Sequence, residues 1–392
     1  MTDPAARSGG AGITRSVLRR PPPAGEAQRG SVTAVHQFLP ALLPGDAVGM
    51  HTLEMRRALQ DAGFASEIFV EAVHAELEGQ ARHFSEFPGF ARGSLLLYQL
   101  ATGSVLADYV FSRPEPLVVD YHNLTPAEFF RAWDTDVANA LNWGRAQLAH
   151  LAPRTSLGMA DSSFNELELM ELDYRRTAVV PILLDLETMT ADVDVTCLAT
   201  LEKAKADGGA DLLFVGRLAP NKAQHELIKA LVMYRRVYDP RARLRLIGRP
   251  ATDSYARALG RYATEMGVAD AVIIRERVSG GELSAHYRAA DALVILSEHE
   301  GFCVPLLEAM LHGVPIVARP CGAVPETLAT AGLVVSDRSP ATVAAAVHRV
   351  VTDDALRRAL VDAGRQRLAE FDLARSRLRL IEALAPLTGV MP

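Results

Sequence analysis

Residues 297–326 read SEHEGFCVPLLEAMLHGVPIVARPCGAVPE, and this stretch indicates the fold. The apolar run at 292–296 that precedes it predicts a buried strand. Proline is favoured in the first turn of a helix, so Pro305 predicts a loop over 300–303 and a helix over 304–311. The free N–H groups and the positive dipole end of such a helix point into the crevice beside the loop. The stretch therefore predicts a site for an anion.

Two carboxylates flank the predicted anion site. Glu300 lies on the loop and Glu308 lies just inside the helix. On one continuous helix, residues eight positions apart would be about 12 Å apart along the axis, too far to hold one small group. Carboxylates are poor ligands for phosphate but good acceptors for sugar hydroxyls, so the implied ligand is a sugar joined to a diphosphate. The alternative is an ordinary helix with two solvated glutamates.

The run EGFCVPLLEAM at 300–310 resembles the E-x(7)-E motif of retaining glycosyltransferases of family 4. The segments GVPIVA and PE that follow it fit the same family. This resemblance implies the α/β GT-B architecture, in which two Rossmann-like domains face each other across a cleft. The family usually has glycine at the position of Cys303, which bears on the choice of donor sugar.

The bulk composition excludes several classes of protein. The chain has 392 residues, enough for two domains, and a net charge of −6, so no overall basic field attracts nucleic acid. Its three cysteines form no metal-ligand pattern and suggest a reducing, cytoplasmic location. No apolar run is long enough to span a bilayer. Peripheral membrane contact is left open, and the oligomeric state is not indicated.

The domain boundaries follow from composition and pattern. Residues 1–30 read as a disordered tail, although Arg15, Arg19 and Arg20 could contact an anionic surface. We expect an acceptor-side domain over 31–190 and a domain that binds the nucleotide sugar over 191–372. A helix over 373–385 is expected to return to the first domain. The D-x-D sequence at 192–194 falls in the linker, so we do not interpret it as a metal motif.

The first domain opens in the manner of a Rossmann fold. A strand at 32–38 precedes a loop at 39–49 and a helix at 51–61. Gly45 and Gly49 do not form a dinucleotide fingerprint, so NAD is not expected. The resemblance implies that backbone amides of this loop approach the donor diphosphate, and Gly49 is the better candidate. A simple turn is the alternative for both glycines.

His122 follows the buried strand at 116–121, where ligands of open α/β sheets bind. The resemblance places a histidine here near the donor sugar, which it would orient while steadying positive charge at the anomeric carbon. Tyr121, Asn123 and Trp133 are candidates for the acceptor side. The alternative is a histidine with a structural role.

Arg217 and Lys222 lie between a strand at 211–215 and a helix at 223–234. They can converge on one anion together with the helix N-terminus. Preorganised cations there would offset the charge that develops on a leaving phosphate oxygen. The resemblance matches both residues to a G-R-L…K motif. Two surface bases in a loop are the alternative.

The resemblance also implies how the donor is held. Glu300 would accept a hydrogen bond from a hydroxyl of the donor sugar, and Glu308 would accept one from the ribose. The backbone near Val278 would contact the nucleotide base of the donor. The diphosphate would lie against the backbone of Gly301, Phe302, Cys303, Val304, Pro305 and Leu306.

The sequence thus predicts a glycosyltransferase that moves a sugar from a UDP- or GDP-linked donor to an acceptor hydroxyl with retention, without a cofactor or metal. The acceptor would be a sugar, a lipid-linked molecule or a small molecule. One alternative is a sugar-nucleotide epimerase or hydrolase of the same fold, which needs further carboxylates in the cleft. The other is a non-catalytic sugar-nucleotide-binding protein.

Overall fold

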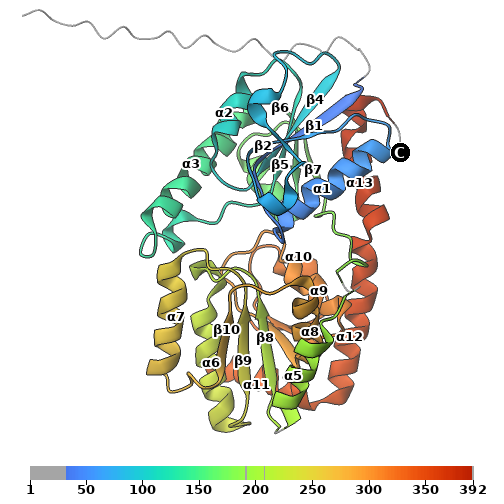
Figure 1. The fold of residues 1–392 in the computed structure, drawn as a ribbon. Helices are drawn as coiled ribbons and strands as arrows, with labels where there is room; N and C mark the ends of the chain where they lie inside the picture. Colours follow the sequence, from blue (N-terminus) through green and yellow to red (C-terminus); the bar gives the residue numbers. More distant parts are fainter. Residues whose placement is uncertain (1–31, 190–191, 207, 391–392) are drawn as a thin grey trace, which may run out of the picture. The chain divides into compact units, whose positions relative to one another are not determined.

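Two parallel β-sheets organise the chain (Figure 1). The computed structural model describes residues 32–189, 192–206 and 208–390. The predicted tail at 1–30, which includes Arg15, Arg19 and Arg20, lies outside the described residues, as does the predicted boundary at 190–191. The strand order is β3-β2-β1-β4-β5-β6-β7 in the first sheet and β10-β9-β8-β11-β12-β13 in the second. Both orders are those of doubly wound sheets, as the sequence predicts.

The first sheet is built from strands β1 Ala34–Leu42, β2 Ile68–Val73, β3 Arg82–His83, β4 Ser94–Leu100, β5 Leu117–Tyr121, β6 Thr155–Ala160 and β7 Thr177–Val179. Its helices are α1 Ala47–Asp61, α2 Val105–Ser112, α3 Thr135–Leu151 and α4 Ser163–Glu171.

The second sheet is built from strands β8 Asp211–Val215, β9 Arg243–Ile247, β10 Val272–Arg275, β11 Ala292–Ile295, β12 Ile316–Ala318 and β13 Leu333–Val334. Its helices are α5 Val195–Ala206, α6 Gln224–Val237, α7 Asp253–Glu265, α8 Gly280–Ala289, α9 Val304–Leu311, α10 Val324–Leu328, α11 Pro340–Thr352 and α12 Asp354–Leu368. The last helix, α13, spans Leu373–Thr388.

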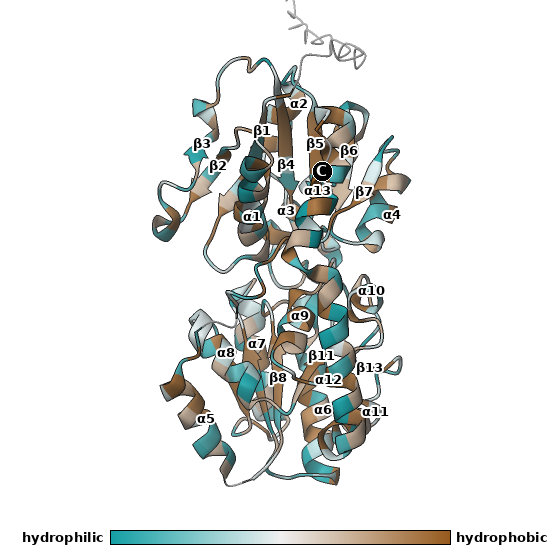
Figure 2. Cartoon of the chain, turned by 90° about the vertical axis from the view of Figure 1, so that its right-hand side faces the viewer, coloured by the Kyte–Doolittle hydropathy of each residue, from teal (hydrophilic) through white to brown (hydrophobic). Residues whose placement is uncertain are grey.

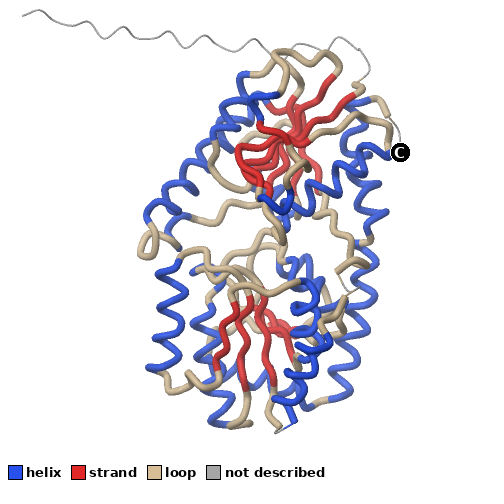
Figure 3. The backbone as a smooth tube through the Cα atoms, viewed as in Figure 1, coloured by secondary structure: helices blue, strands red, loops and turns tan. Residues whose placement is uncertain are grey.

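The cores lie between the sheets and the helices that cover them. In Figure 3 the strands form two separate groups with helices around each. Every residue of β4, β5 and β11 is buried, as expected of central parallel strands. Figure 2 shows the strands mostly hydrophobic, while α12 carries a hydrophilic surface. Apolar burial therefore fixes the sheets and leaves the strand ends free for polar side chains.

The opening of the first sheet differs from the prediction. Strand β1 continues to Leu42, although a loop was expected from residue 39. Pairing with β4 ends at Phe38, whereas pairing with β2 continues to Leu42. Pro40 therefore lies where only one neighbouring strand remains, and its missing N–H is tolerated there. Gly49 lies in the first turn of α1, not in a loop, and donates its N–H to the capping Asp46 carboxylate at 3.1 Å.

The C-terminal helix packs on the first sheet's side of the chain. Leu380 and Leu384 of α13 share a buried cluster with Met55 of α1. Arg377 forms ion pairs with Glu54 at 3.2 Å and with Asp61 at 3.0 Å, both on α1. The chain thus contributes its last helix to the half in which it begins.

The contact between α2 and α3 generates a stability prediction. A Cβ atom at Gly144 of α3 would lie 2.8 Å from the backbone N of Gly103, which precedes α2. Gly144→Ala is therefore expected to lower the free energy of unfolding by about 1–3 kcal/mol, because one helix must move. At Gly260 of α7 an added Cβ meets no atom within 4 Å. Gly260→Ala, the matched control, should raise stability by about 0.5–1 kcal/mol through helix propensity. Urea denaturation of both variants measures the difference, and equal effects would contradict the close approach.

Candidate active site

Helix α9 begins and ends where the sequence predicts, at Val304 and Leu311. The residue before it, Cys303, is buried and has φ 74°, in the left-handed region. Glycine adopts this conformation without the steric cost of a Cβ atom, which explains why glycine suits the position. The first turn of α9 directly follows the loop that carries Glu300, and within it the Leu306 N–H donates to the Cys303 carbonyl at 3.0 Å.

Lys222 and Glu300 form an ion pair at this loop. Lys222 Nζ lies 2.6 Å from Glu300 Oε2, and Ser297 Oγ donates to Glu300 Oε1 at 2.7 Å. The side chains are 18% and 6% exposed, so the pair is largely shielded from water. Residues 78 positions apart thus converge beyond the carboxyl ends of β8 and β11, and the predicted anion site at Lys222 stays a prediction.

The other residues predicted to bind the sugar donor differ in exposure and in partners. Arg217 is exposed and forms no ion pair with any residue that the structure describes. Tyr287 donates its hydroxyl to Glu308 Oε2 at 2.6 Å. Burial raises the pKa of Glu308, and this hydrogen bond opposes the rise. Val278 is half-buried and precedes Ser279, the residue that caps α8.

The loop at 300–303 contacts the first half of the chain, the part that contains the first sheet. Ser162 Oγ, at the start of α4, donates to the Gly301 carbonyl at 2.7 Å. A Cβ atom at position 301 would lie only 2.4 Å from Asn123 Cβ, so glycine alone permits this approach. Glu326 accepts hydrogen bonds from the backbone N and the hydroxyl of Ser163. The carboxyl ends of β5 and β6 therefore meet the loop that carries Glu300.

The predicted acceptor-side residues occupy different surroundings. Tyr121 is 0% exposed and donates to the Glu168 carboxylate, so its ring has no surface to offer an acceptor, which corrects that assignment. Asn123 is half-buried, has φ 72° and donates to Asn165 at 2.8 Å. The Trp133 ring packs edge-on against Tyr255, with ring centroids 4.9 Å apart.

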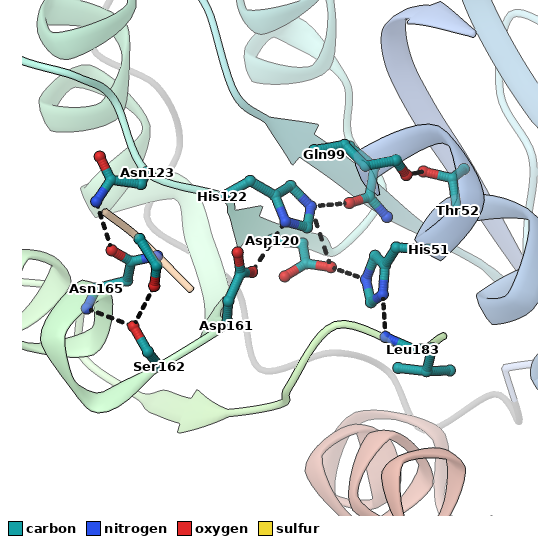
Figure 4. Close-up of polar contacts among 12 residues, drawn as sticks. His51, Thr52, Gln99, Asp120, His122, Asn123, Asp161, Ser162, Asn165 and Leu183 are labelled. Atoms are coloured by element: carbon teal, nitrogen blue, oxygen red, sulfur yellow. Dashed lines mark hydrogen bonds and ion pairs between the residues drawn. The ribbon is translucent and has the colours of Figure 1, made fainter. Parts of the chain in front are cut away.

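The His122 side chain lies in a buried polar cluster, which Figure 4 shows. The ring is 1% exposed, and its backbone supplies most of the exposed surface of the residue. Nδ1 lies 2.9 Å from Asp161 Oδ1, an ion pair by distance but not an aligned hydrogen bond. Nε2 faces Gln99 Oε1 and lies 3.7 Å from Asp120 Oδ2. The ring therefore faces Asp161, Asp120 and Gln99, and the expectation that it orients the donor sugar stays a prediction.

A chain of amides fixes the protonation of His122 Nε2. The Thr52 carbonyl can only accept, and Gln37 Nε2 donates to it at 3.0 Å. Gln37 Oε1 then accepts from Gln99 Nε2 at 3.1 Å, so Gln99 presents Oε1 to the histidine. Nε2 of His122 must therefore carry a hydrogen.

His51 on α1 has the opposite constraint. Its Nδ1 accepts the Leu183 N–H at 2.8 Å, so the proton of the ring is on Nε2, which lies 3.0 Å from Asp120 Oδ2. His51, Asp120 and His122 each offer one ligand atom, all within 4.8 Å of one another. A metal-binding histidine normally donates its second N–H, whereas His51 accepts at that nitrogen. Metal binding through Nε2 would require an imidazolate, so these residues do not fit a metal ion.

The carboxylates set the charge state of His122. Burial lowers its pKa, but Asp161 and Asp120, with Asp46, raise it to about 9. Burial raises the pKa of Asp120, but His122 and His51 outweigh burial and hold it below its ordinary value. Burial raises the pKa of Asp161, which His122 opposes.

The sequence analysis did not identify His51, Asp120 and Asp161 as site residues. Asp120 falls inside a run interpreted as a buried strand, and a carboxylate one residue before the strand end was a usable signal. Nothing in the sequence pairs it with His51, 69 positions earlier on a helix.

A cavity of about 360 Å³ borders this cluster. Asp161 and Ser162 line one side, and Phe302, Glu326 and Arg367 belong to its other walls. Polar groups from both halves of the chain therefore face a space large enough for a small polar ligand.

Comparison with known proteins agrees with this arrangement. The family model of glycosyl transferases group 1 matches residues 201–367. A D-inositol 3-phosphate glycosyltransferase of Geodermatophilus obscurus is 30% identical over 401 residues, covering 90% of this chain and 87% of that protein. A GDP-mannose-dependent alpha-(1-6)-phosphatidylinositol monomannoside mannosyltransferase of Mycobacterium tuberculosis is 35% identical over 161 residues, 39% of this chain and 41% of that protein.

Solved structures show the same fold. The crystal structure of Anabaena Alr3699/HepE in complex with UDP and glucose has a TM-score of 0.70 at 18% identity, covering 89% of this chain and 99% of that chain. WaaG, a glycosyltransferase involved in lipopolysaccharide biosynthesis, has a TM-score of 0.63 at 15% identity, covering 89% of this chain and 98% of that chain.

The two parallel sheets and these similarities define a glycosyltransferase with the GT-B fold, which confirms the predicted fold class and enzyme class. The chain belongs to the glycosyl transferases group 1 family. None of the described helices is long and apolar enough to cross a membrane.

The His122 cluster generates a pH prediction. A histidine whose pKa is raised from 6.5 in the unfolded chain to about 9 in the folded protein stabilises the fold fully below pH 6.5. That contribution is lost as the pH rises toward 9. The free energy of unfolding should therefore fall between pH 6.5 and about pH 8 in the wild type, and fall less in His122→Gln. Urea denaturation at both pH values measures this, and an equal pH dependence in both proteins would contradict it.

Proposed function

We propose that this chain is a retaining glycosyltransferase of family 4 that transfers a sugar from a nucleoside diphosphate donor, UDP- or GDP-linked, to an acceptor hydroxyl. The observation that carries the proposal is Glu300, which pairs with Lys222 before the N-terminus of α9 and has Glu308 eight positions later, the spacing of the E-x(7)-E motif. The group 1 relatives support it, since they are glycosyltransferases and one uses GDP-mannose.

The donor diphosphate would lie between α9 and the side chains of Lys222 and Arg217. The N–H groups at the start of α9 offer hydrogen bonds, and Lys222 and Arg217 offer positive charge. Lys222 would exchange part of its contact with Glu300 for the phosphate. Glu300 has two oxygens and further lone pairs, so it can accept a sugar hydroxyl while Ser297 still donates to it.

The nucleoside would lie along α8 and α9. Glu308 retains exposed surface and accepts from Tyr287 through Oε2, which leaves acceptor capacity for ribose hydroxyls. The backbone beside Val278 would frame the base, and Gly49 in the first turn of α1 would approach the donor from the opposite half.

The chemistry would proceed on one face of the sugar. The bond between the anomeric carbon and the phosphate oxygen breaks, positive charge builds on the sugar, and the acceptor oxygen forms the new bond. The leaving phosphate oxygen takes the acceptor proton. Lys222 and Arg217 stabilise the phosphate charge, which needs no metal.

The acceptor would be a polyol or its phosphate. D-inositol 3-phosphate glycosyltransferases that cover most of this chain act, by their names, on a phosphorylated polyol. Asn123 and the exposed part of Trp133 would contact the acceptor.

The experiment that tests the function is donor binding and turnover with UDP-, GDP- and ADP-sugars in the presence of a chelator. We expect tight binding of one donor, slow breakdown without an acceptor, and transfer when D-inositol 3-phosphate or a simple hexose is added. Rapid conversion without any acceptor would indicate the epimerase or hydrolase alternative. Binding without turnover on any acceptor would indicate a sugar-nucleotide-binding protein.

Substitution of Lys222 tests the role of the cation. Lys222→Ala should lower kcat roughly 100-fold, since it removes charge stabilisation of the leaving phosphate, with little change in the KM of the acceptor. The control is Lys229→Ala on α6. Lys229 pairs with Glu226 of the same helix, with 2.8 Å between Nζ and Oε1, and does not belong to the loop that carries Glu300. Steady-state kinetics of both variants measure the effect. Normal turnover in Lys222→Ala would remove this lysine from the mechanism.

A further inference from the structure

We propose that Asp120, held by His51, gives the His122 cluster one net negative charge, and that this charge stabilises the positive sugar during transfer. The inference rests on the proposed function and deepens it. Asp120 is a positioning and electrostatic residue here, because its side chain is buried and does not reach the cleft.

The charge count follows from the hydrogen bonds. His51 is neutral, because Nδ1 accepts the Leu183 N–H and Nε2 carries the proton. His122 carries a hydrogen on Nε2, because Gln99 presents its Oε1 to this nitrogen. The hydrogen bonds from Gln99 to Gln37 and from Gln37 to the Thr52 carbonyl fix that orientation of Gln99. Its Nδ1 lies 2.9 Å from Asp161 Oδ1, a distance at which two lone pairs repel, so one of these two atoms carries a proton.

The net charge of the cluster is the same whether His122 or Asp161 holds that proton. An imidazolium with a carboxylate is neutral as a pair, and so is an imidazole with a carboxylic acid. Asp120 then remains as one uncompensated negative charge. No lysine or arginine in the described part of the chain forms an ion pair with Asp120 or Asp161, and Asp120 Oδ1 has no hydrogen-bond partner.

The His122 cluster lies directly behind the strand ends that contact the loop at 300–303. His122 is followed by Asn123 and Asp161 by Ser162, and both following residues contact Gly301. Gly301 is adjacent to Glu300, which pairs with Lys222. A diphosphate bound at Lys222 would bring the donor sugar toward Gly301 and the adjoining Asn123, the residue that follows His122.

The electrostatic consequence is specific to the transition state. The neutral donor sugar gains little from a negative charge in the protein, whereas a sugar that develops positive charge gains more as the bond to phosphate breaks. Burial limits the screening of that charge by water. The imidazolium of His122 alone would have the wrong sign for this task, and Asp120 supplies the required sign.

The first test compares two buried carboxylates, Asp120 in β5 and Glu115 just before this strand. Asp120→Asn keeps the shape and the acceptor for His51 but removes the charge. It should lower kcat roughly 10- to 100-fold while the Kd of UDP or GDP stays within about twofold. The control, Glu115→Gln, removes an equally buried carboxylate just before the other end of β5 and should leave kcat unchanged. Equal kcat values in the two variants would overturn the proposal.

A spectroscopic measurement separates this role from a purely structural one. NMR titration of ¹⁵N-labelled histidine should show the pKa of His122 lower in Asp120→Asn than in the wild type. In Glu115→Gln it should stay at the wild-type value. An unchanged His122 titration in Asp120→Asn would show that Asp120 does not act on the cluster electrostatically.

The second test needs no variant and remains valid if Asp120→Asn fails to fold. Deoxynojirimycin or deoxymannojirimycin, which are cationic, is compared with the 1,5-anhydrohexitol of the same configuration, which is neutral. Each is bound to the wild type in the presence of UDP or GDP. The cation should bind at least about tenfold more tightly. Equal binding would contradict the proposal, while absence of any donor turnover by the wild type would refute the proposed function instead.

Discussion

The approach of Gly301 to Asn123 is the contact on which the site depends. An added Cβ atom at position 301 would lie 2.4 Å from Asn123 Cβ, so only glycine lets the loop after β11 touch the end of β5. The hydrogen bond from Ser162 to the Gly301 carbonyl fixes the same loop against the end of β6. These two contacts bring Glu300 and Lys222 within reach of the polar strand ends of the first half.

Charge is distributed unequally across this contact. On the side of the second sheet, Lys222, which pairs with Glu300, would hold the proposed diphosphate together with Arg217 and the N-terminus of α9. On the side of the first sheet, Asp120 leaves one negative charge behind the backbone of His122. A leaving phosphate and an electron-poor sugar carry charges of the opposite signs, so the two sides complement the two products of bond cleavage.

The sequence predicted the second half well, because its signals are local. Pro305 and the apolar run before the loop placed α9, whereas the pairing of Lys222 with Glu300 was not predicted, because it joins residues 78 positions apart. The first half was less predictable, because its cluster joins residues from α1, β4, β5 and β6. Tyr121 was assigned to the acceptor side because it ends a strand, but the pleat turns its ring into the core.

The measurement that tests the central claim most directly is the anomeric configuration of the first product formed. Early ¹H NMR spectra of the reaction with a donor of known configuration report it before the product anomer can equilibrate. Transfer between a diphosphate held by Lys222 and an acceptor on the same face predicts that the new linkage keeps the configuration of the donor. An inverted linkage would contradict this account, because it requires attack from the opposite face and a separate base.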